Sequence, residues 1–306
     1  MSRTLTHDLD DRFPQVGALS AALESVGYLV GEQLGAALFL AVRMGQPILL
    51  EGEPGVGKTE AAKALAAAID TPLVRLQCYE GITASEALYE WNYPRQLLAI
   101  RLAEAAGEHI RDKDLFTEEY LLPRPLLTAL LHPGPRPAVL LIDEVDRADE
   151  EFEAFLLEVL SDFQVSIPEV GTVRAERRPA VVLTSNRSRD LSDALRRRCL
   201  YLWIDYPTLE KELRIVRSRV PGLSEQLARE LTTFMQSLRR LKLQKTPGVA
   251  ESLDWAAALV SLHASHLDAA LVQETLGCFL KDEADLRALT GRLAQGELEA
   301  LCSPLG

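Results

Sequence analysis

Five short apolar runs recur along the chain before residue 205, each bounded by turn residues or charges, with helical patterns between them. Alternation of this kind is typical of a parallel sheet that carries helices on both faces. We therefore predict an α/β fold. Its expected strands are ILLEG (48–52), LVRLQC (73–78), AVLLI (138–142), AVVLTS (180–185) and LYLWI (200–204).

Apolar residues at helical spacing precede the first predicted strand. Leu34, Leu38 and Val42 fall on one face of a helix that ends at Gly45. After the first strand comes a glycine-rich turn, and TEAAKALAAAI then continues as a second helix. The order is strand, loop, helix.

The strand pattern stops after Pro207. Apolar residues then recur at spacings of four and three, as on the buried face of a helix, at Leu227, Leu231, Phe234, Leu238 and Leu241. Further helical patterns are SLDWAAALVSLH, DAALVQETLGCFL and DEADLRALTGRLA. We predict two domains, an α/β domain over residues 1–206 and a small all-helical domain over 207–306.

Charge narrows the range of partners. The 306 residues hold 45 acidic and 33 basic side chains, a formal net charge of −12. No broad positive field is therefore expected, which argues against nucleic acid as the main partner.

The amino terminus is polar and acidic, unlike a secretory signal, and Arg43 interrupts the most apolar helical stretch. We expect a cytoplasmic protein with no stable membrane insertion. Four cysteines are scattered without a CxxC pair, which predicts buried reduced thiols.

Residues 52–59, GEPGVGKT, match the pattern G-x-x-x-x-G-K-[ST] between a predicted strand and a predicted helix. Such a loop turns backbone N–H groups toward phosphate oxygens, so we predict ATP as the cofactor. Lys58 is expected to reach the β- and γ-phosphates, and the Thr59 hydroxyl to bind Mg²⁺. The expected nucleotide-contacting residues are Glu53, Pro54, Gly55, Val56, Gly57, Lys58, Thr59 and Glu60. The alternative is a glycine turn that only packs.

AVLLIDEVDRA places two carboxylates at the carboxyl end of a strand, where α/β sheets bind ligands. Asp143 is expected to hold Mg²⁺ through water, and Glu144 to orient and deprotonate the attacking water. The alternative is a solvated strand end.

Two further candidates follow. Asn186 ends the AVVLTSN strand and would lie beside the nucleotide if that strand lies between the other two; otherwise it is a turn residue. Arg196, Arg197 and Arg198 precede the last strand. They either complement a helix dipole or supply an arginine finger to a neighbouring subunit.

The order of these motifs resembles that of AAA+ ATPases. The resemblance implies a P-loop core with a parallel five-stranded sheet, an insert in the second helix, a hairpin before the asparagine strand, and a helical lid. FQVSIPEVGTVRAERRPAVVLTSN resembles that hairpin, and DEVDRA with the long insert between residues 78 and 137 resembles the MoxR group. That group implies a hexameric, chaperone-like ring.

CYEGITASEALYEWNYPRQLLAIR, DLFTEEYLLPRPLL and DEVDRADEEFEAFLLEVLSDFQ resemble the MoxR-type ATPase encoded beside aerobic carbon monoxide dehydrogenase and related molybdenum hydroxylases. This resemblance implies a client metalloenzyme whose metal centre is matured, and a von Willebrand A-domain partner. It places the arginine finger at Arg198, with Arg197 next. It also places Tyr28 and Val30 beside the adenine, with helix-entry packing as an equal alternative.

The sequence departs from the AAA+ pattern in the lid. Many lids carry an arginine that reaches the γ-phosphate, but here Glu251 and Asp254 occupy the corresponding positions. Either another group senses the nucleotide, with Arg147 or Arg187 as candidates, or the lid is weakly coupled to the phosphate.

An aromatic stretch lies in the insert, with Tyr79, Tyr89, Trp91 and Tyr93. Alone, these residues predict core packing. YEWNYPR suits a loop, and within the MoxR resemblance Trp91 and Tyr93 are expected to contact a client. Three functions stay open: a client-remodelling ATPase, a nucleotide-switched regulatory module with slow hydrolysis, and a DNA-directed machine, against which the charge argues.

Overall fold

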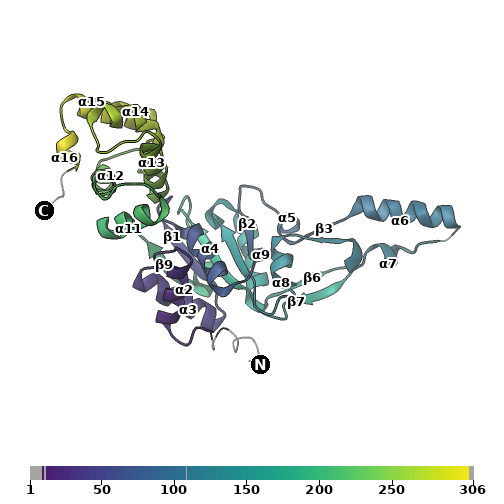
Figure 1. Cartoon of the computed structure of the whole chain (residues 1–306). Helices are drawn as coiled ribbons and strands as arrows, with labels where there is room; N and C mark the ends of the chain where they lie inside the picture. Colours follow the sequence, from purple (N-terminus) through teal and green to yellow (C-terminus); the bar gives the residue numbers. More distant parts are fainter. Residues whose placement is uncertain (1–8, 10–11, 108, 303–306) are drawn as a thin grey trace. The chain divides into compact units, whose positions relative to one another are not determined.

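The computed structural model describes Leu9, residues 12–107 and residues 109–302 (Figure 1). A five-stranded parallel sheet with the order β2-β5-β8-β1-β9 forms its centre. The strands are β1 (Ile48–Gly52), β2 (Leu73–Gln77), β5 (Val139–Asp143), β8 (Ala180–Ser185) and β9 (Leu200–Ile204). All five predicted strands are confirmed, and β8 lies between β5 and β1, the condition set for Asn186.

The strands are apolar because neighbouring elements cover the sheet. β1 and β5 are buried at every position. One continuous hydrophobic core joins β5 to α8 (Pro125–Leu130) and α9 (Glu150–Asp162). The parallel register pairs Gln77 with Asp143 and Glu51 with Ser185, so polar strand ends gather at one edge.

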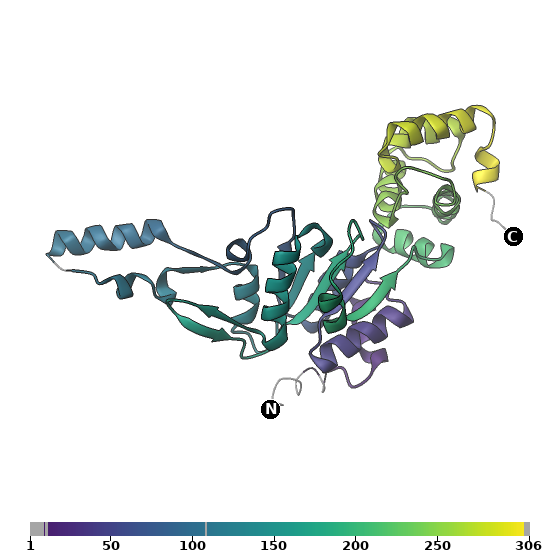
Figure 2. The same cartoon turned by 180° about the vertical axis from the view of Figure 1, so that it is seen from behind.

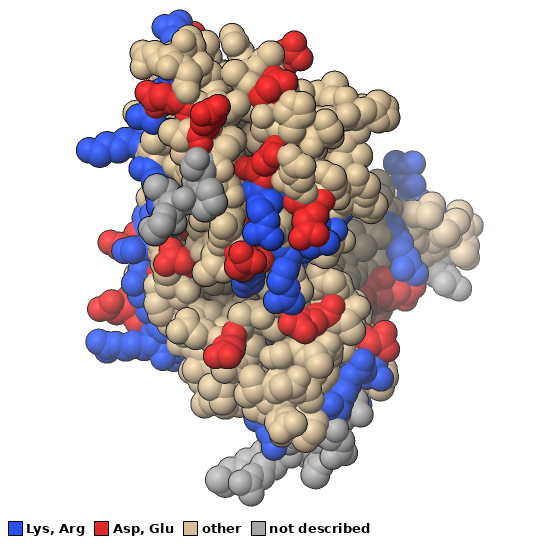
Figure 3. Space-filling view, turned by 60° about the vertical axis from the view of Figure 1, so that its left-hand side comes forward, with Lys and Arg blue, Asp and Glu red and all other residues tan. Residues whose placement is uncertain are grey.

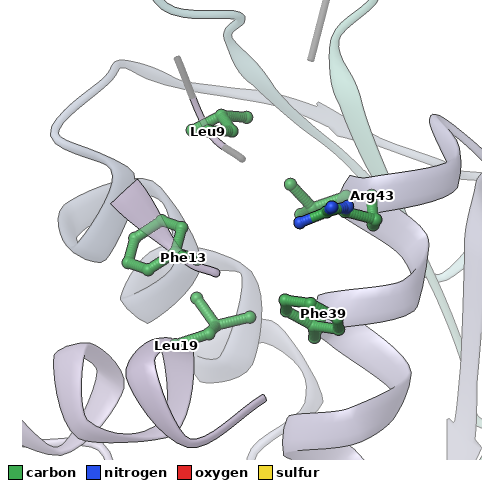
Figure 4. Close-up of a pocket in the computed structure, with 6 residues that line it drawn as sticks. Leu9, Phe13, Leu19, Phe39 and Arg43 are labelled. Atoms are coloured by element: carbon green, nitrogen blue, oxygen red, sulfur yellow. The ribbon is translucent and has the colours of Figure 1, made fainter. Parts of the chain in front are cut away.

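Helices α2 (Val16–Ser25) and α3 (Glu32–Met44) precede the sheet. Gly45 caps α3 in the left-handed conformation at φ 61°, which confirms the predicted end of that helix. A small cavity beside them has a volume of about 10 Å³, room for no more than about one water molecule, so it is a packing gap rather than a ligand site. Its lining, drawn in Figure 4, is Leu9, Phe13, Leu19, Phe39, Val42 and Arg43.

The insert between β2 and β5 contains helices and strands in the residues that the structure describes. It contains α5 (Ala84–Leu88), β3 (Tyr89–Trp91), α6 (Tyr93–Ala106), α7 (Asp112–Leu115), η1 (Glu118–Tyr120) and β4 (Leu121–Pro123). β3 pairs antiparallel with β4, and α6 extends away from the sheet in Figures 1 and 2.

The expectation of a loop at YEWNYPR is wrong. Strand β3 is followed at once by α6, because the Asn92 side chain accepts the N–H of Arg95 as an N-cap. Pro94 lies in the first helical turn, where its missing N–H costs nothing.

Trp91, a predicted client contact, is only 8% exposed. Its ring packs edge to face on Tyr89 and Phe116, with centroids 5.8 and 5.2 Å apart. Trp91 therefore belongs to the core of the insert, whereas Tyr93 is 61% exposed.

A hairpin precedes β8, as predicted. Its strands are β6 (Gln164–Ile167) and β7 (Gly171–Arg174), paired antiparallel. Gly171 makes the turn possible at φ 98°, a backbone conformation that favours glycine.

The carboxyl-terminal part is helical throughout its regular structure. Its elements are α11 (Leu209–Arg219), α12 (Glu225–Leu238), α13 (Val249–Ser261), α14 (Ala269–Phe279), α15 (Glu283–Ala294) and α16 (Leu298–Cys302). Phe234, Trp255 and Phe279 pack together in tilted and edge-to-face arrangements at its centre, with Trp255 and Phe279 centroids 4.3 Å apart. The Trp255 indole N–H donates to Thr275 at 2.8 Å, which satisfies its polar atom.

The chain divides into two compact units. One contains Met1–Glu51 and Thr59–Trp203; the other contains Gly52–Lys58 and Ile204–Gly306. The glycine-rich loop thus clusters with the helical segments. Among the residues described, no helix combines the length and apolar character that crossing a bilayer requires.

Candidate nucleotide-hydrolysis site

The glycine-rich loop has the backbone of a phosphate cradle. Gly55 and Gly57 adopt φ values of 74° and 96°, which turn successive peptide groups inward and disfavour any side chain. The Lys58 ammonium donates to the carbonyls of Gly52 and Glu53 at 2.7 and 2.8 Å. Helix α4 (Lys58–Ile69) begins there, so the loop fits an anionic group at a helix amino end.

The two predicted magnesium ligands lie side by side. Thr59 Oγ1 donates to Asp143 Oδ1 at 3.1 Å, and Asp143 is 3% exposed at the end of β5. Thr184 Oγ1 also donates to Asp143 Oδ1, at 2.5 Å. Within the described residues, no group of three or more His, Cys, Asp or Glu side chains could hold a metal alone. A hydroxyl and one carboxylate suit Mg²⁺ that brings phosphate and water ligands.

Arg75, in β2, was missed by the sequence reasoning. Its Nε and Nη2 donate to Asp143 Oδ2 at 3.0 and 2.6 Å. The only sequence signal was a pair of polar residues two apart, Arg75 and Gln77, in an otherwise apolar strand. Such residues share one face of a strand, here the face beside Asp143.

Glu144 has a strained backbone and a held side chain. It adopts φ 54° and ψ 49°, which is uncommon for a residue other than glycine and recurs at functional sites. Its Oε2 accepts from Gln77 Nε2 at 3.1 Å and Arg147 Nη1 at 3.2 Å. Its backbone N–H donates to Thr184 Oγ1 at 2.9 Å. The carboxylate is therefore fixed from two sides.

Asp146 shapes the loop that carries Asn186. This buried carboxylate, another residue that the sequence reasoning missed, accepts at Oδ2 from the N–H groups of Asn186 and Ser188, at 3.2 and 2.8 Å. Ser188 Oγ donates to the same oxygen at 2.7 Å. The position of Asn186 is therefore set from η2 (Val145–Arg147), directly after Glu144.

The three arginines differ in their surroundings. Arg196, in α10 (Asp193–Arg198), lies 3.5 Å from the fully buried Glu51 at the end of β1. Arg198 donates to the Leu157 carbonyl at 3.4 Å. Arg197 is exposed and, among the described residues, has neither an ion-pair nor a hydrogen-bond partner. Of the three arginines, Arg197 alone is thus unengaged within the part of the chain that the structure describes.

The predicted adenine border lies near the start of α4. Burial raises the pKa of Tyr28 above its ordinary value, with a further contribution from the charge of Glu60. Val30 is half-buried and packs near Gly35 of α3. The structure thus brings Tyr28 and Glu60 together, while Val30 has the surroundings of a helix-entry residue.

Charge is mixed on one face of the molecule. Acidic and basic side chains are interspersed over the face seen in Figure 3. This distribution agrees with the excess of acidic residues and differs from the continuous basic surface that phosphate-backbone binding favours.

Comparison with known protein families identifies the segment that contains these site residues. A family model described as AAA domain (dynein-related subfamily) matches residues 47–199, half of the chain. The chain belongs to this AAA domain family. It is an ATPase of the AAA+ class, and the matched segment of this AAA ATPase runs from the start of β1 to the end of α10.

Relatives of the AAA ATPase include the denitrification regulatory protein NirQ of Pseudomonas aeruginosa strain PAO1. The two are 27% identical over 229 residues, which cover 72% of this chain and 78% of NirQ. Similar solved structures include the RuvB Holliday junction branch migration motor of Thermotoga maritima, with 19% identity, 95% and 83% of the two chains covered and a TM-score of 0.47. A Cytophaga hutchinsonii protein shows 15% identity, 95% and 94% coverage and the same TM-score. At these values the structural likenesses carry no conclusion about function.

Proposed function

We propose that this AAA ATPase is a MoxR-type remodelling protein that matures or activates a client metalloenzyme. The client class is a molybdenum hydroxylase such as carbon monoxide dehydrogenase, reached through the sequence resemblance. The observation that carries the ATP-driven part is the adjacency of Thr59, Asp143 and Glu144 around the carboxyl end of β5. The proposed site of action is the cytoplasm.

ATP with Mg²⁺ supplies the phosphoanhydride bond whose hydrolysis drives the cycle. Lys58 and the N–H groups of the loop bind and orient the phosphates. Thr59 and Asp143 would hold the metal. Glu144 Oε2 takes a proton from the attacking water, and Asn186 aligns that water. Gln77 and Arg147 fix the Glu144 carboxylate beforehand.

The proposed assembly is a ring, most simply a hexamer, in which an arginine enters the neighbouring site. The sequence resemblance favoured Arg198, but Arg197 is the arginine of α10 that has no partner among the described residues. We therefore assign Arg197 as the first candidate for the finger and Arg198 as the second. The resemblance further supports a von Willebrand A-domain protein as the adaptor of this ring.

The proposed client surface is α6 rather than Trp91. Tyr93, Leu97, Leu98 and Leu102 are 53–62% exposed on this projecting helix. A cluster of exposed apolar side chains on one element usually marks a site that binds another molecule. Replacing Leu97 and Leu102 together by Ser should abolish client activation and spare ATP hydrolysis. Leu262→Ser, at a residue 54% exposed in the helical unit, is the matched control.

Glu144→Gln tests the whole proposal. The variant should bind ATP, hydrolyse it at less than about a thousandth of the normal rate, and fail to activate the client. Glu151→Gln, at an exposed residue of α9, should behave as the unmodified chain. Proteins that co-purify with the Glu144→Gln variant in ATP should include a metalloenzyme or an A-domain protein.

A second function is favoured by the name of NirQ, which describes a regulatory protein. In that case the chain is a nucleotide-switched module with slow hydrolysis. Full client activation by the Glu144→Gln variant would support this function and reject the motor.

A further inference from the structure

The glycine-rich loop and the start of α13 meet backbone to backbone. The Val249 N–H donates to the Gly55 carbonyl at 3.0 Å. A Cβ added to Gly248 would lie 2.7 Å from the Gly55 Cα and 2.8 Å from the Pro54 carbonyl oxygen. A Cβ added to Gly55 would lie 3.0 Å from the Gly248 Cα. The contact therefore requires glycine on both sides.

Glu251 holds the Pro247–Gly248 turn, the segment that leads into α13. Its Oε2 accepts the Gly248 N–H at 2.8 Å, which satisfies a backbone donor at the start of α13. The same oxygen lies 3.3 Å from the Cβ position of Gly55. No Lys or Arg occurs in the sequence between Lys245 and Lys281, so α13 brings a carboxylate and no cationic side chain to the loop.

Arg239 holds the turn from within the helical unit. Its Nε donates to the Pro247 carbonyl at 2.8 Å, and its Nη2 donates to the Gly248 carbonyl at 3.2 Å. The guanidinium also makes a bidentate pair with Glu212 of α11, at 2.5 and 2.7 Å. Both side chains are almost fully buried, and the Arg239 guanidinium stacks over the Tyr206 ring at 4.8 Å.

The pairing leaves this arginine little freedom. A bidentate arginine–carboxylate pair sets the orientation of the guanidinium, and burial excludes competing water. Ser252 of α13 adds a hydrogen bond to Glu212 at 2.6 Å. The Pro247–Gly248 turn is thereby tied to α11 and α13 at once.

We propose that Arg239 and Glu251 are positioning residues for nucleotide binding. They hold the Pro247–Gly248 turn against Gly55 and keep the loop in its phosphate-binding shape. Movement of the helical segments reaches the loop through this backbone contact, without a lysine or arginine of α13 on the phosphate. The inference rests on nucleotide binding by residues 52–59, part of the proposed function, and is independent of the client.

Gly248→Ala tests the contact directly. Gly248 has φ −86° and ψ −168°, a conformation open to alanine, so the substitution reports the close approach and not backbone strain. We expect the Kd of a fluorescent ATP analogue, measured with Mg²⁺ in the full chain, to rise about tenfold or more. Gly277→Ala in α14 is the matched control, because no atom lies within 4 Å of its added Cβ.

Two variants of Glu251 distinguish the positioning role of its side chain from the effect of its charge. Glu251→Ala removes the acceptor for the Gly248 N–H and should weaken binding several-fold, whereas Glu251→Gln retains a carbonyl acceptor and should restore it to within about twofold. Thermal unfolding of each variant identifies losses that come from unfolding alone. If the unmodified chain binds the ATP analogue, and Gly248→Ala and Glu251→Ala bind it with unchanged Kd values, the inference is wrong. A wild-type chain that binds no ATP contradicts the proposed function as well.

Discussion

The Arg75 guanidinium lies 2.6 Å from the Asp143 carboxylate, across the register of two neighbouring strands. Asp143 Oδ1 accepts from Thr59 and Thr184, so both carboxylate oxygens already have donors. A Mg²⁺ ion bound through Asp143 would therefore compete with Arg75 for the carboxylate. Because Arg75 is half exposed, its pair with Asp143 is worth only about 1 kcal/mol.

Arg75→Met should lower the Mg²⁺ concentration that gives half-maximal ATP hydrolysis, by about two- to fivefold. The reason is that Asp143 Oδ2 becomes available to the metal's water ligands. A magnesium titration of the steady-state rate measures the change.

Arg95→Met is the control for this substitution. Arg95 pairs with Glu119 at 2.7 Å with a similar exposure, in the insert and away from Asp143. Its magnesium requirement should stay unchanged. A higher requirement in Arg75→Met would mean instead that Arg75 orients Asp143 for the metal.

Asp146→Ala should lower the stability of the chain and the rate of ATP hydrolysis without a large change in KM for ATP. Removing this carboxylate leaves the N–H groups of Asn186 and Ser188 without their acceptor and should lower the free energy of unfolding by about 1 to 3 kcal/mol. Because Asn186 loses its position, kcat should fall while KM for ATP stays within about twofold. Asn186→Ala should reproduce the lower kcat without the loss of stability. A normal kcat in Asp146→Ala would remove Asn186 from the proposed alignment of water.

Much of this site follows from order along the chain. Parallel strands joined by helices bring their carboxyl ends to one edge, so the motifs at Thr59, Asp143 and Asn186 meet once the strand order is known. Loop and strand motifs are local, and short apolar runs between turn signals were enough to locate all five strands.

The partners of these residues are not local. Arg75 reaches Asp143 only through the register of β2 on β5, which no short segment of sequence encodes. Helix α6 was missed for a related reason. Its apolar residues Leu97, Leu98 and Leu102 face outward instead of marking a buried stripe, so the spacing that reveals packed helices is weak there.

Substitutions of Arg197 and of Arg196 should have different effects. Arg197→Ala should reduce ATP hydrolysis by about a thousandfold with unchanged thermal stability, because an arginine finger acts on a neighbouring site. Arg196→Ala should lower the free energy of unfolding by about 1 to 3 kcal/mol, because Glu51 stays buried without its cation. Activity regained on mixing Arg197→Ala with Glu144→Gln subunits would confirm action across an interface. Full activity of Arg197→Ala, with loss in Arg198→Ala, would restore the assignment from the resemblance.

Cys78 should be inert toward thiol reagents in the folded chain. Burial raises its pKa to about 12, with further contributions from the charges of Asp143, Asp146 and Glu144. A raised folded-state pKa contributes stability that is complete below the ordinary thiol value of 9.0 and is lost as pH rises through about 12. Labelling with a maleimide at pH 8 should modify Cys278, which is partly exposed, before Cys78. Rapid labelling of native Cys78 would contradict this environment.

Trp91→Ala should destabilise the insert, not merely remove a client contact. The buried ring packs on Tyr89 and Phe116, and large-to-small changes at such sites cost about 3 to 5 kcal/mol. Proteolysis should therefore cut the segment around α6 faster in this variant. Tyr93→Ala, at a side chain 61% exposed, should leave proteolysis and ATP hydrolysis unchanged and weaken client activation. If Trp91→Ala resists protease as well as the unmodified chain and loses only client activation, the ring reaches the client in a conformation that exposes it.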